Sequence, residues 1–348
     1  MIQERKSDHV DIVLGHDVSA RVNWWDRVWL VHEALPELDM DSIDTGTRLF
    51  GRDLAMPLVI VAMTGGYPRG ERINANIARA AAEAGVGMGV GSQRAGLERQ
   101  ELARTYGIVK DHDVPLVIGN LGAPQLVRQA GRPAYGVDEA RRAMEMVDAD
   151  VLAVHLNFLQ EAVQAEGDRN AVGCLDAIRS LAAEVPVVVK ETGAGLSSAT
   201  LDVLVDTGIV GLDIGGLGGT SFSAVEALRA PEGSLLRRCG MTFRDWGVPA
   251  PVSLALAAGR FECIATGGVR NGLDAAKAVA MGARSAGMAA ALLRAAAESA
   301  DAVAAEIEAI RRELVTAMFL TGSASVDALR RKRVVMDPMV EHWMERSR

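Results

Sequence analysis

The sequence is poor in cysteine and in net positive charge, and each shortage excludes a class of protein. Its three cysteines in 348 residues share no CxxC spacing, which speaks against a disulfide framework and against a structural zinc site. The formal net charge of −8 provides no basic surface for nucleic acid or for an anionic membrane. Any anionic ligand must therefore be bound by local donors.

Long apolar runs are also missing. The first ten residues, MIQERKSDHV, open with charges and contain no apolar signal core, and no uninterrupted apolar run is long enough to span a bilayer. Together with the cysteine pattern, these features predict a soluble, cytoplasmic protein in a reducing compartment, with neither nucleic acid nor a membrane as its partner.

What the sequence does contain is a regular alternation of short apolar runs, glycine-rich or polar turns, and helical patterns. The expected strands cover residues 57–63, 87–91, 115–119, 151–154, 185–189, 209–214, 262–265 and 285–288. Alternation of this kind forces parallel pairing through crossover helices. Eight such units predict a single α/β domain with the (β/α)8 fold of a TIM barrel.

Segments on both sides of the barrel are expected to belong to the same domain. We predict an N-terminal extension over residues 1–55, the barrel over 56–298 and a C-terminal helical extension over 299–348. Trp24, Trp25 and Trp29 are expected to pack the first extension onto the barrel or onto another subunit. These tryptophans and the apolar C-terminal helices favour a homo-oligomer, a tetramer or an octamer.

Four polar side chains of different kinds follow the strand expected at residues 151–154. They are His155, Asn157, Gln160 and Glu161. One of them alone would most simply be a core histidine or a loop cap with its own partner, but four together would each need a partner if they were buried without a ligand. Because barrels of this kind carry their active sites at the carboxyl ends of the strands, the cluster predicts the active site.

Two glycine-rich turns, at residues 215–220 and 267–270, are candidates for binding phosphate. Glycine lets backbone amides approach an anion closely, and a following helix N-terminus adds favourable partial charge. The common phosphate site of these barrels lies after strands seven and eight, which suits Gly267, Gly268, Ala289 and Ala290. The two turns favour a cofactor that carries phosphate.

Lys190 ends an otherwise apolar strand, and its role is open at this point. It could be a Schiff-base nucleophile, as in an aldolase, or a fixed cation beside a bound ring. It could also be paired with Glu191 or Asp213, since a buried charge needs a partner. An FMN-dependent 2-hydroxy-acid oxidase or dehydrogenase would carry a histidine base in the loop after strand six, and that loop contains no histidine.

Together, nine motifs resemble one family, the FMN-dependent type II isopentenyl diphosphate isomerases. In chain order they are RKSDH at 5–9, MTGG at 63–66, GVGSQR at 89–94, GNLGA at 119–123, HLNFLQE at 155–161, EGD at 166–168, VKETGAGLS at 189–197, GGLGGTSF at 215–222 and ATGGVRNGLDAAKA at 265–278. The resemblance covers nearly the whole barrel. It implies the reversible isomerisation of isopentenyl diphosphate to dimethylallyl diphosphate, with reduced FMN as the acid and base, Mg²⁺, and NADPH as reductant.

The resemblance also assigns residues. It implies that FMN is held by Met63, Thr64, Ser92, Asn120, Lys190, Thr220, Gly268, Arg270, Ala289 and Ala290. It places the prenyl diphosphate substrate at Arg5, Lys6, Arg94, His155, Asn157 and Gln160, and Mg²⁺ at Glu161. The catalytic residues would be Gln160, His155 and Lys190. A carboxylate with phosphate oxygens suits magnesium, and arginine suits a diphosphate.

The N-terminal residues and three positions in the barrel bear on this resemblance. On sequence alone, Arg5, Lys6 and His9 would be read as a solvated tail, and the resemblance reverses this by placing them over the mouth of the site. Phe158 and Ala165 stand where proline is usual, and Phe222 stands where many members have tryptophan near the substrate. These differences bear on substrate shape and rate more than on flavin binding.

Overall fold

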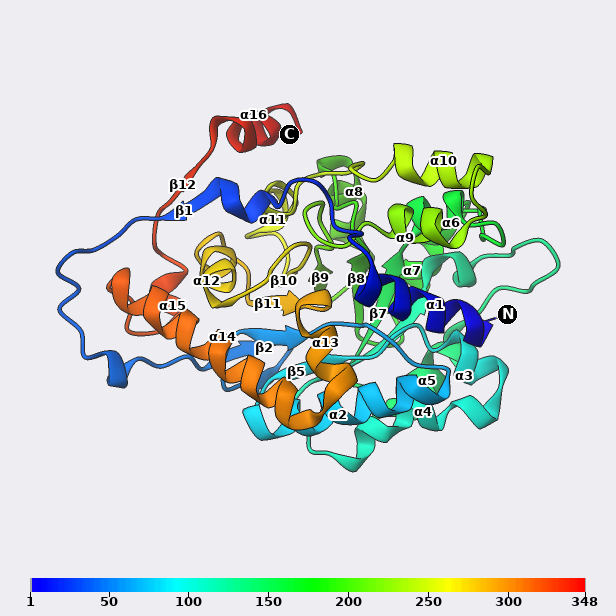
Figure 1. Cartoon of the computed structure of the whole chain (residues 1–348), viewed down its shortest axis with the longest axis horizontal. Coiled ribbons are helices and arrows are strands. Elements are labelled where there is room, and N and C mark those ends of the chain that lie inside the picture. The colour runs from blue at the N-terminus through cyan, green and yellow to red at the C-terminus, as the bar shows by residue number, and fades with distance from the viewer. Residues whose placement is uncertain (1, 348) are drawn as a thin grey trace.

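Eight parallel strands close into a barrel in the computed structural model, which describes residues 2–347 (Figure 1). In chain order they are β4 (Leu58–Ile60), β5 (Gly87–Gly89), β6 (Val117–Gly122), β7 (Val151–Leu156), β8 (Val187–Glu191), β9 (Gly211–Asp213), β10 (Cys263–Ala265) and β11 (Ser285–Met288). Each neighbouring pair is hydrogen-bonded, and β11 pairs with β4 to complete the ring. The predicted TIM barrel is confirmed.

Helices connect the strands and form the outer layer. They are α2 (Pro68–Ala84), α3 (Arg94–Glu98), α4 (Arg104–Gly107), α5 (Val137–Val147), α6 (Phe158–Val163), α7 (Cys174–Ala182), α8 (Ser198–Leu204), α9 (Phe222–Arg229), α10 (Leu235–Thr242), α11 (Ala250–Ala257), α12 (Gly272–Ala280) and α13 (Ala290–Glu298). Local signals set their ends. Proline opens α2, and the side chain of Asn271 accepts the Asp274 N–H to cap α12.

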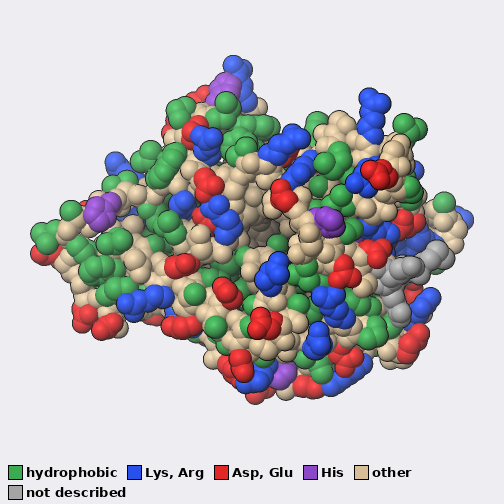
Figure 2. All heavy atoms as spheres, viewed as in Figure 1, with side chains coloured by type: hydrophobic (Ala, Val, Ile, Leu, Met, Phe, Trp, Pro, Cys, Tyr) green, Lys and Arg blue, Asp and Glu red, His purple; other side chains and the backbone are tan. Residues whose placement is uncertain are grey.

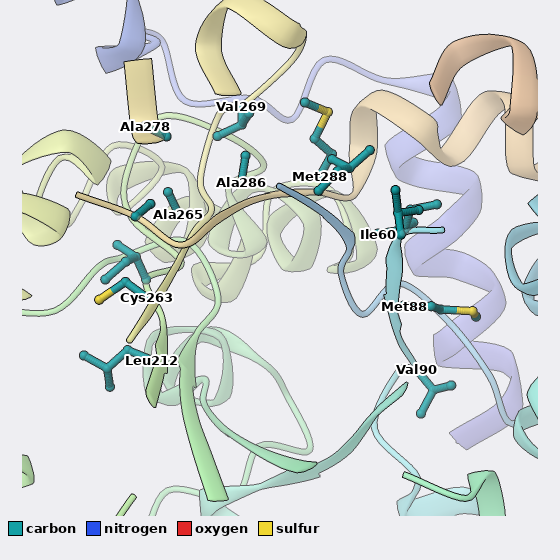
Figure 3. Packing of buried hydrophobic residues seen from close by; sticks show 14 of the residues in the cluster. Ile60, Met88, Val90, Leu212, Cys263, Ala265, Val269, Ala278, Ala286 and Met288 are labelled. Atoms are coloured by element: carbon teal, nitrogen blue, oxygen red, sulfur yellow. The ribbon is translucent and has the colours of Figure 1, made fainter. Parts of the chain in front are cut away.

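Two apolar clusters hold the barrel together. The outer cluster joins the strands to the helices, and Figure 3 shows part of it around Met88, Leu212 and Met288. The inner cluster fills the barrel with strand residues such as Val59, Val151 and Val188. It also includes Leu49 and Leu54 of the hairpin formed by β2 (Thr47–Leu49) and β3 (Arg52–Leu54), so the barrel interior is packed and a ligand must bind at the rim.

The N-terminal extension begins with α1 (Ile2–Gly15), followed by η1 (Trp24–Arg27), β1 (Val28–Leu30) and η2 (Met40–Ser42). Trp25 is fully buried and its indole N–H donates to Gly267 O over 3.0 Å. Trp29, by contrast, is 47% exposed. The expected packing onto the barrel is therefore made by Trp25 and not by Trp29.

The C-terminal part contains α14 (Ala300–Leu320), α15 (Val326–Leu329) and α16 (Pro338–Arg346). The prediction of an entirely helical extension is wrong in one place, because β12 (Val334–Met336) pairs antiparallel with β1. A strand of three residues is too short to show an alternating pattern. Within residues 2–347, no helix combines the length and the apolar character needed to cross a membrane.

Candidate active site

A cavity of about 720 Å³ opens at the carboxyl ends of the strands, beneath α1, and Figure 2 shows this face hollowed near its centre. All residues that the sequence assigned to cofactor, substrate or metal line it. They are Arg5, Lys6, Met63, Thr64, Ser92, Arg94, Asn120, His155, Asn157, Gln160, Glu161, Lys190, Thr220, Gly268, Arg270, Ala289 and Ala290. Its volume is in the ordinary range for a site that binds small molecules.

One end of the cavity is built from glycine backbone. Gly267 and Gly268 have φ values of 94° and 87°, which favour glycine. A Cβ on Gly268 would meet Gly218 O at 2.5 Å, so the two glycine-rich turns pack directly against each other. Beside them, α13 begins at Ala290 without a side-chain cap. This combination of close-packed turns and a free helix N-terminus fits a phosphate group.

Arg270 lies at the rim of the same end. Its guanidinium binds the carboxylates of Asp26 and Asp274, with Nε 2.8 Å from Asp274 Oδ2. Arg270 is thus an ion-paired cation at the rim of the cavity.

Lys190 occupies the centre of the site, and the structure decides among its possible partners. Lys190 Nζ lies 2.5 Å from Asp213 Oδ2. Asp213 also accepts from the Thr266 hydroxyl, which itself accepts the Gly215 N–H over 2.7 Å. The ammonium group is thus held as a fixed cation, the arrangement expected of a group that stabilises negative charge on a ring.

Glu191, the other expected partner of Lys190, instead binds the backbone of the loop that follows β8. One of its carboxylate oxygens accepts the N–H groups of Gly193, Ala194 and Gly195 and so shapes the loop after β8. Burial raises the pKa of Glu191 to about 7 even though these N–H groups favour the charged form.

His155 is held as a neutral ring. Its Nδ1 lies 2.7 Å from Asn120 Oδ1, and the Asn120 amide is oriented by donating to Val90 O over 3.0 Å. Asn120 Oδ1 can only accept, so the proton is on Nδ1 of His155 and Nε2 is left as an acceptor. Burial lowers the pKa of His155 to about 3, and the charge of Lys190 adds to the effect.

The basic end of the cavity is supplied largely by α1. Lys6 Nζ donates to Ser92 O over 2.6 Å and to the Tyr106 hydroxyl, and Arg5 lies at the edge of the cavity 3.9 Å from Glu166. Burial lowers the pKa of Lys6 to about 7, with Arg5 and Arg94 contributing. Reading these residues as a solvated tail is therefore wrong.

Arg94 reaches the same end from α3. It donates to Glu98 Oε1 over 2.8 Å and to Asp168 Oδ2 over 3.0 Å. Lys6, Arg5 and Arg94 together place three basic side chains around one part of the cavity. This part can bind an anion with several negative oxygens.

Gln160 and Glu161, on α6, line the cavity, and Glu161 adjoins Asp168, the partner of Arg94. Gln160 Nε2 donates to Glu226 Oε1 over 2.9 Å. Glu161 accepts from Asn157 Nδ2 over 2.9 Å and from the Asp168 N–H over 2.7 Å, and its burial raises its pKa. Among residues 2–347, no three His, Cys, Asp or Glu side chains gather as a metal site, so Mg²⁺ at Glu161 would need further oxygens from an amide, water or phosphate.

One residue at this site, Glu226, was missed from the sequence. Glu226, on α9, accepts from Gln160 and from His9 Nε2, which is 2.8 Å away. Burial opposes its ionisation, but His9, Gln160 and Arg229 together lower the pKa of Glu226 to about 2. No motif in the sequence connects residue 9 with residue 226, because only the docking of α1 on α9 brings them together.

His9 is a histidine that reaches the site from outside the barrel. The loop after β9 contains none, as expected, but α1 brings His9 against Phe222 at the start of α9, with ring centroids 6.0 Å apart. A histidine therefore does reach this side of the cavity. Its Nε2 is bonded to Glu226, a contact that orients the ring toward α9.

Fold and cavity define a (β/α)8 barrel with a glycine-rich rim that would fit a phosphate group. A model of the FMN-dependent dehydrogenase family matches residues 249–336. The barrel is also similar to a mandelate oxidase solved with an FMN adduct, with a TM-score of 0.64, 20% identity, and coverage of 97% of this chain and 99% of that one. At this identity, the likeness shows the fold.

Full-length relatives identify the family. Isopentenyl-diphosphate delta-isomerase of Thermoplasma volcanium is 44% identical over 347 residues, covering 99% of this chain and 100% of the relative. The enzyme of that name from Stutzerimonas stutzeri is 47% identical, covering 95% and 96%. The chain belongs to the isopentenyl-diphosphate delta-isomerase family, so the family expected from the motifs is confirmed.

Proposed function

We propose that the protein converts isopentenyl diphosphate reversibly into dimethylallyl diphosphate, using reduced FMN. The observation that carries the proposal is the division of one cavity into two ends. A glycine-built end with Lys190 suits the flavin and its phosphate, while the end around Lys6, Arg5 and Arg94 suits a diphosphate. The family of the chain supports both assignments.

Bound FMN in its reduced form supplies a proton donor and acceptor and an electron-rich ring face, which together serve an isomerisation without net redox change. The residues of the chain hold the reactants. Lys190, fixed by Asp213, balances negative charge on the ring, and the glycine turns hold the phosphate. Thr64, Ser92 and Asn120, from the carboxyl ends of β4, β5 and β6, also line the cavity.

Gln160 positions the allylic part of the substrate and does not act as an acid, because an amide has no useful pKa. Its bond to ionised Glu226 fixes the orientation of the amide, with Nε2 toward α9. His155 contributes a neutral acceptor at Nε2 and no positive charge. Lys6, Arg5 and Arg94 therefore carry most of the attraction for the diphosphate.

Glu161 would hold Mg²⁺ in a bridge to the diphosphate, and NADPH would reduce the flavin. The buried carboxylate fits a hard cation that takes its remaining ligands from substrate and water. We also propose that the chain forms a homo-oligomer, a tetramer or an octamer. Trp29 and Val335, on the paired strands β1 and β12, are 47% and 54% exposed, which supports burial of this surface between subunits.

An anaerobic assay with FMN, NADPH and Mg²⁺ tests the function. We expect turnover of isopentenyl diphosphate only when the flavin is reduced. Equal turnover with oxidised flavin, or without flavin, would contradict the proposal. Bleaching of the oxidised flavin by lactate or glycolate would instead indicate a hydroxy-acid oxidase, and borohydride trapping of a carbonyl substrate on Lys190 would indicate an aldolase.

A further inference from the structure

Asn157 lines the cavity, and its side-chain oxygen is buried without a hydrogen-bond partner in the described part of the chain. The residue is 5% exposed and lines the cavity beside Glu161. Its side-chain Oδ1 is among the few buried polar atoms that lack a hydrogen-bond partner within residues 2–347. A buried carbonyl oxygen without a partner costs free energy, so this atom is expected to meet a ligand.

The orientation of the Asn157 amide is fixed by its neighbours. Nδ2 donates to Glu161 Oε1 over 2.9 Å and to Gln160 Oε1 over 3.3 Å. A rotated amide would place its oxygen against the Glu161 carboxylate, where two acceptors would repel each other. The unpaired atom is therefore the oxygen, and both hydrogens of the amide nitrogen are already used.

This arrangement is unsuited to direct binding of a diphosphate. An ionised diphosphate offers only acceptor oxygens, and Asn157 has no N–H left to donate to it. Its free oxygen would repel phosphate oxygens unless a cation lay between them. Amide oxygens are good ligands for hard divalent cations, and the Glu161 carboxylate is adjacent.

We propose that Asn157 Oδ1 is a ligand of the divalent cation, together with Glu161, and not a donor to the diphosphate. The inference rests on the proposed function, since it concerns the cation that bridges protein and substrate. It changes the role of Asn157, which the family resemblance placed with the diphosphate. It also explains how the cation is held where too few carboxylates gather for a site of their own.

Mn²⁺ replaces Mg²⁺ as the probe in the test, and inorganic pyrophosphate replaces the substrate. Bound and free Mn²⁺ are measured by electron paramagnetic resonance on the FMN-loaded full chain, and flavin absorbance reports that each variant is folded. We expect Asn157→Ala to weaken Mn²⁺ binding about tenfold. Asn157→Asp, which keeps an oxygen ligand, should bind Mn²⁺ as tightly as the wild type or more tightly.

A second measurement separates the cation role from a diphosphate role. Pyrophosphate binding without metal, measured by calorimetry in EDTA, should be unchanged in Asn157→Ala. An equal loss in metal-free pyrophosphate binding would overturn the inference, as would a loss of Mn²⁺ binding in both variants, which would mean that Asn157 only orients Glu161. Asn170→Ala is the matched control, because Asn170 is exposed and bonds Arg128 O outside the cavity.

The wild type distinguishes this inference from the function on which it rests. If the wild type and Asn157→Ala bind Mn²⁺ equally well in the presence of pyrophosphate, only the proposed role of Asn157 is refuted. Wild-type protein that binds no Mn²⁺ would refute the cation bridge as well. The isomerase assay with reduced flavin remains an independent measure of the activity.

Discussion

The two ends of the cavity differ in the chemical groups that form them. The flavin end consists mainly of backbone, from the turns around Gly218 and Gly268 and the start of α13. The diphosphate end consists of long charged side chains, including Lys6 and Arg94, and much of it is carried by a helix outside the barrel. The flavin end is therefore set by the barrel itself, whereas the diphosphate end exists only when α1 is docked.

This difference has a chemical reason. A backbone cradle needs no side chain to move and suits a group that stays bound through many turnovers. Charged side chains that are partly paired with one another, as Arg94 is with Asp168, can exchange these partners for an incoming anion. We therefore expect substitutions at the flavin end to reduce FMN binding strongly. Substitutions elsewhere should change kcat or the KM for the substrate by smaller factors.

The largest effect is expected from Gly268→Ala. The added Cβ would meet Gly218 O at 2.5 Å, and the φ of 87° is strained for alanine. We expect FMN affinity to fall about 1,000-fold, which corresponds to about 4 kcal/mol. Flavin fluorescence titration measures it. Gly259→Ala is the control, because Gly259 has a similar φ of 81° but open space around the added Cβ. An equal loss of FMN affinity in this variant would mean that backbone strain, and not the contact between the two glycine-rich turns, causes the effect.

Gln160→Asn should leave the flavin end intact and damage the reaction. The shorter side chain withdraws the amide from the substrate and from Glu226 Oε1. We expect kcat to fall about 100-fold, as displacements of about 1 Å in an active site do. FMN binding should be unchanged. Turnover at the wild-type rate in this variant would remove Gln160 from the mechanism.

Lys6 gives a prediction about pH at the diphosphate end. Burial lowers its pKa to about 7, so the charged fraction of Lys6 falls as the pH rises through 7. We expect the KM for isopentenyl diphosphate to rise about tenfold between pH 7 and pH 9, because an ammonium group that binds a phosphate is lost. Lys6→Arg stays charged and should show a flatter profile. Identical profiles for the two proteins would exclude Lys6 as the cause.

The smallest effect is expected where the N-terminal extension meets the flavin end. Trp25→Phe removes the indole N–H that donates to Gly267 O and should lower the free energy of unfolding by about 1–2 kcal/mol. Urea unfolding of the FMN-loaded protein, followed by circular dichroism, measures this. Trp29→Phe changes an exposed side chain and should stay within about 0.5 kcal/mol of the wild type. If Trp25→Phe lowers the free energy of unfolding no more than Trp29→Phe does, the indole hydrogen bond of Trp25 does not contribute to stability.

Prediction from the sequence was most successful where the signal was local. The strand at residues 285–288 was placed with the bounds of β11, and the strand at residues 151–154 begins at the first residue of β7. Both are short stretches of small or apolar residues. Strands β1 and β12 were missed, since each has three residues and is defined only by a partner some 300 positions away.

In the site, too, features with a local sequence signal could be predicted and features that depend on distant residues could not. Glycine turns, a lysine at a strand end and a polar cluster after a strand could be recognised from the sequence and its family resemblance. Three features could not be recognised in this way. They are the protonation of His155, the pairing of Lys190 with Asp213 and not Glu191, and the contact between His9 and Glu226. Each depends on a distance between residues far apart in the chain.

The sequence alone determined the eightfold alternation, because hydrophobic period and turn residues act over a few positions. It also placed the polar cluster and the glycine-rich turns at one rim, since parallel strands bring their carboxyl ends together, whereas the flavin and diphosphate residues came from the family resemblance. Only the tertiary structure decided how these residues are charged and oriented, as burial and hydrogen-bond partners set the pKa of Lys6 and leave Asn157 Oδ1 free. Those quantities depend on every neighbour in space, and neighbours in space are not neighbours in the chain.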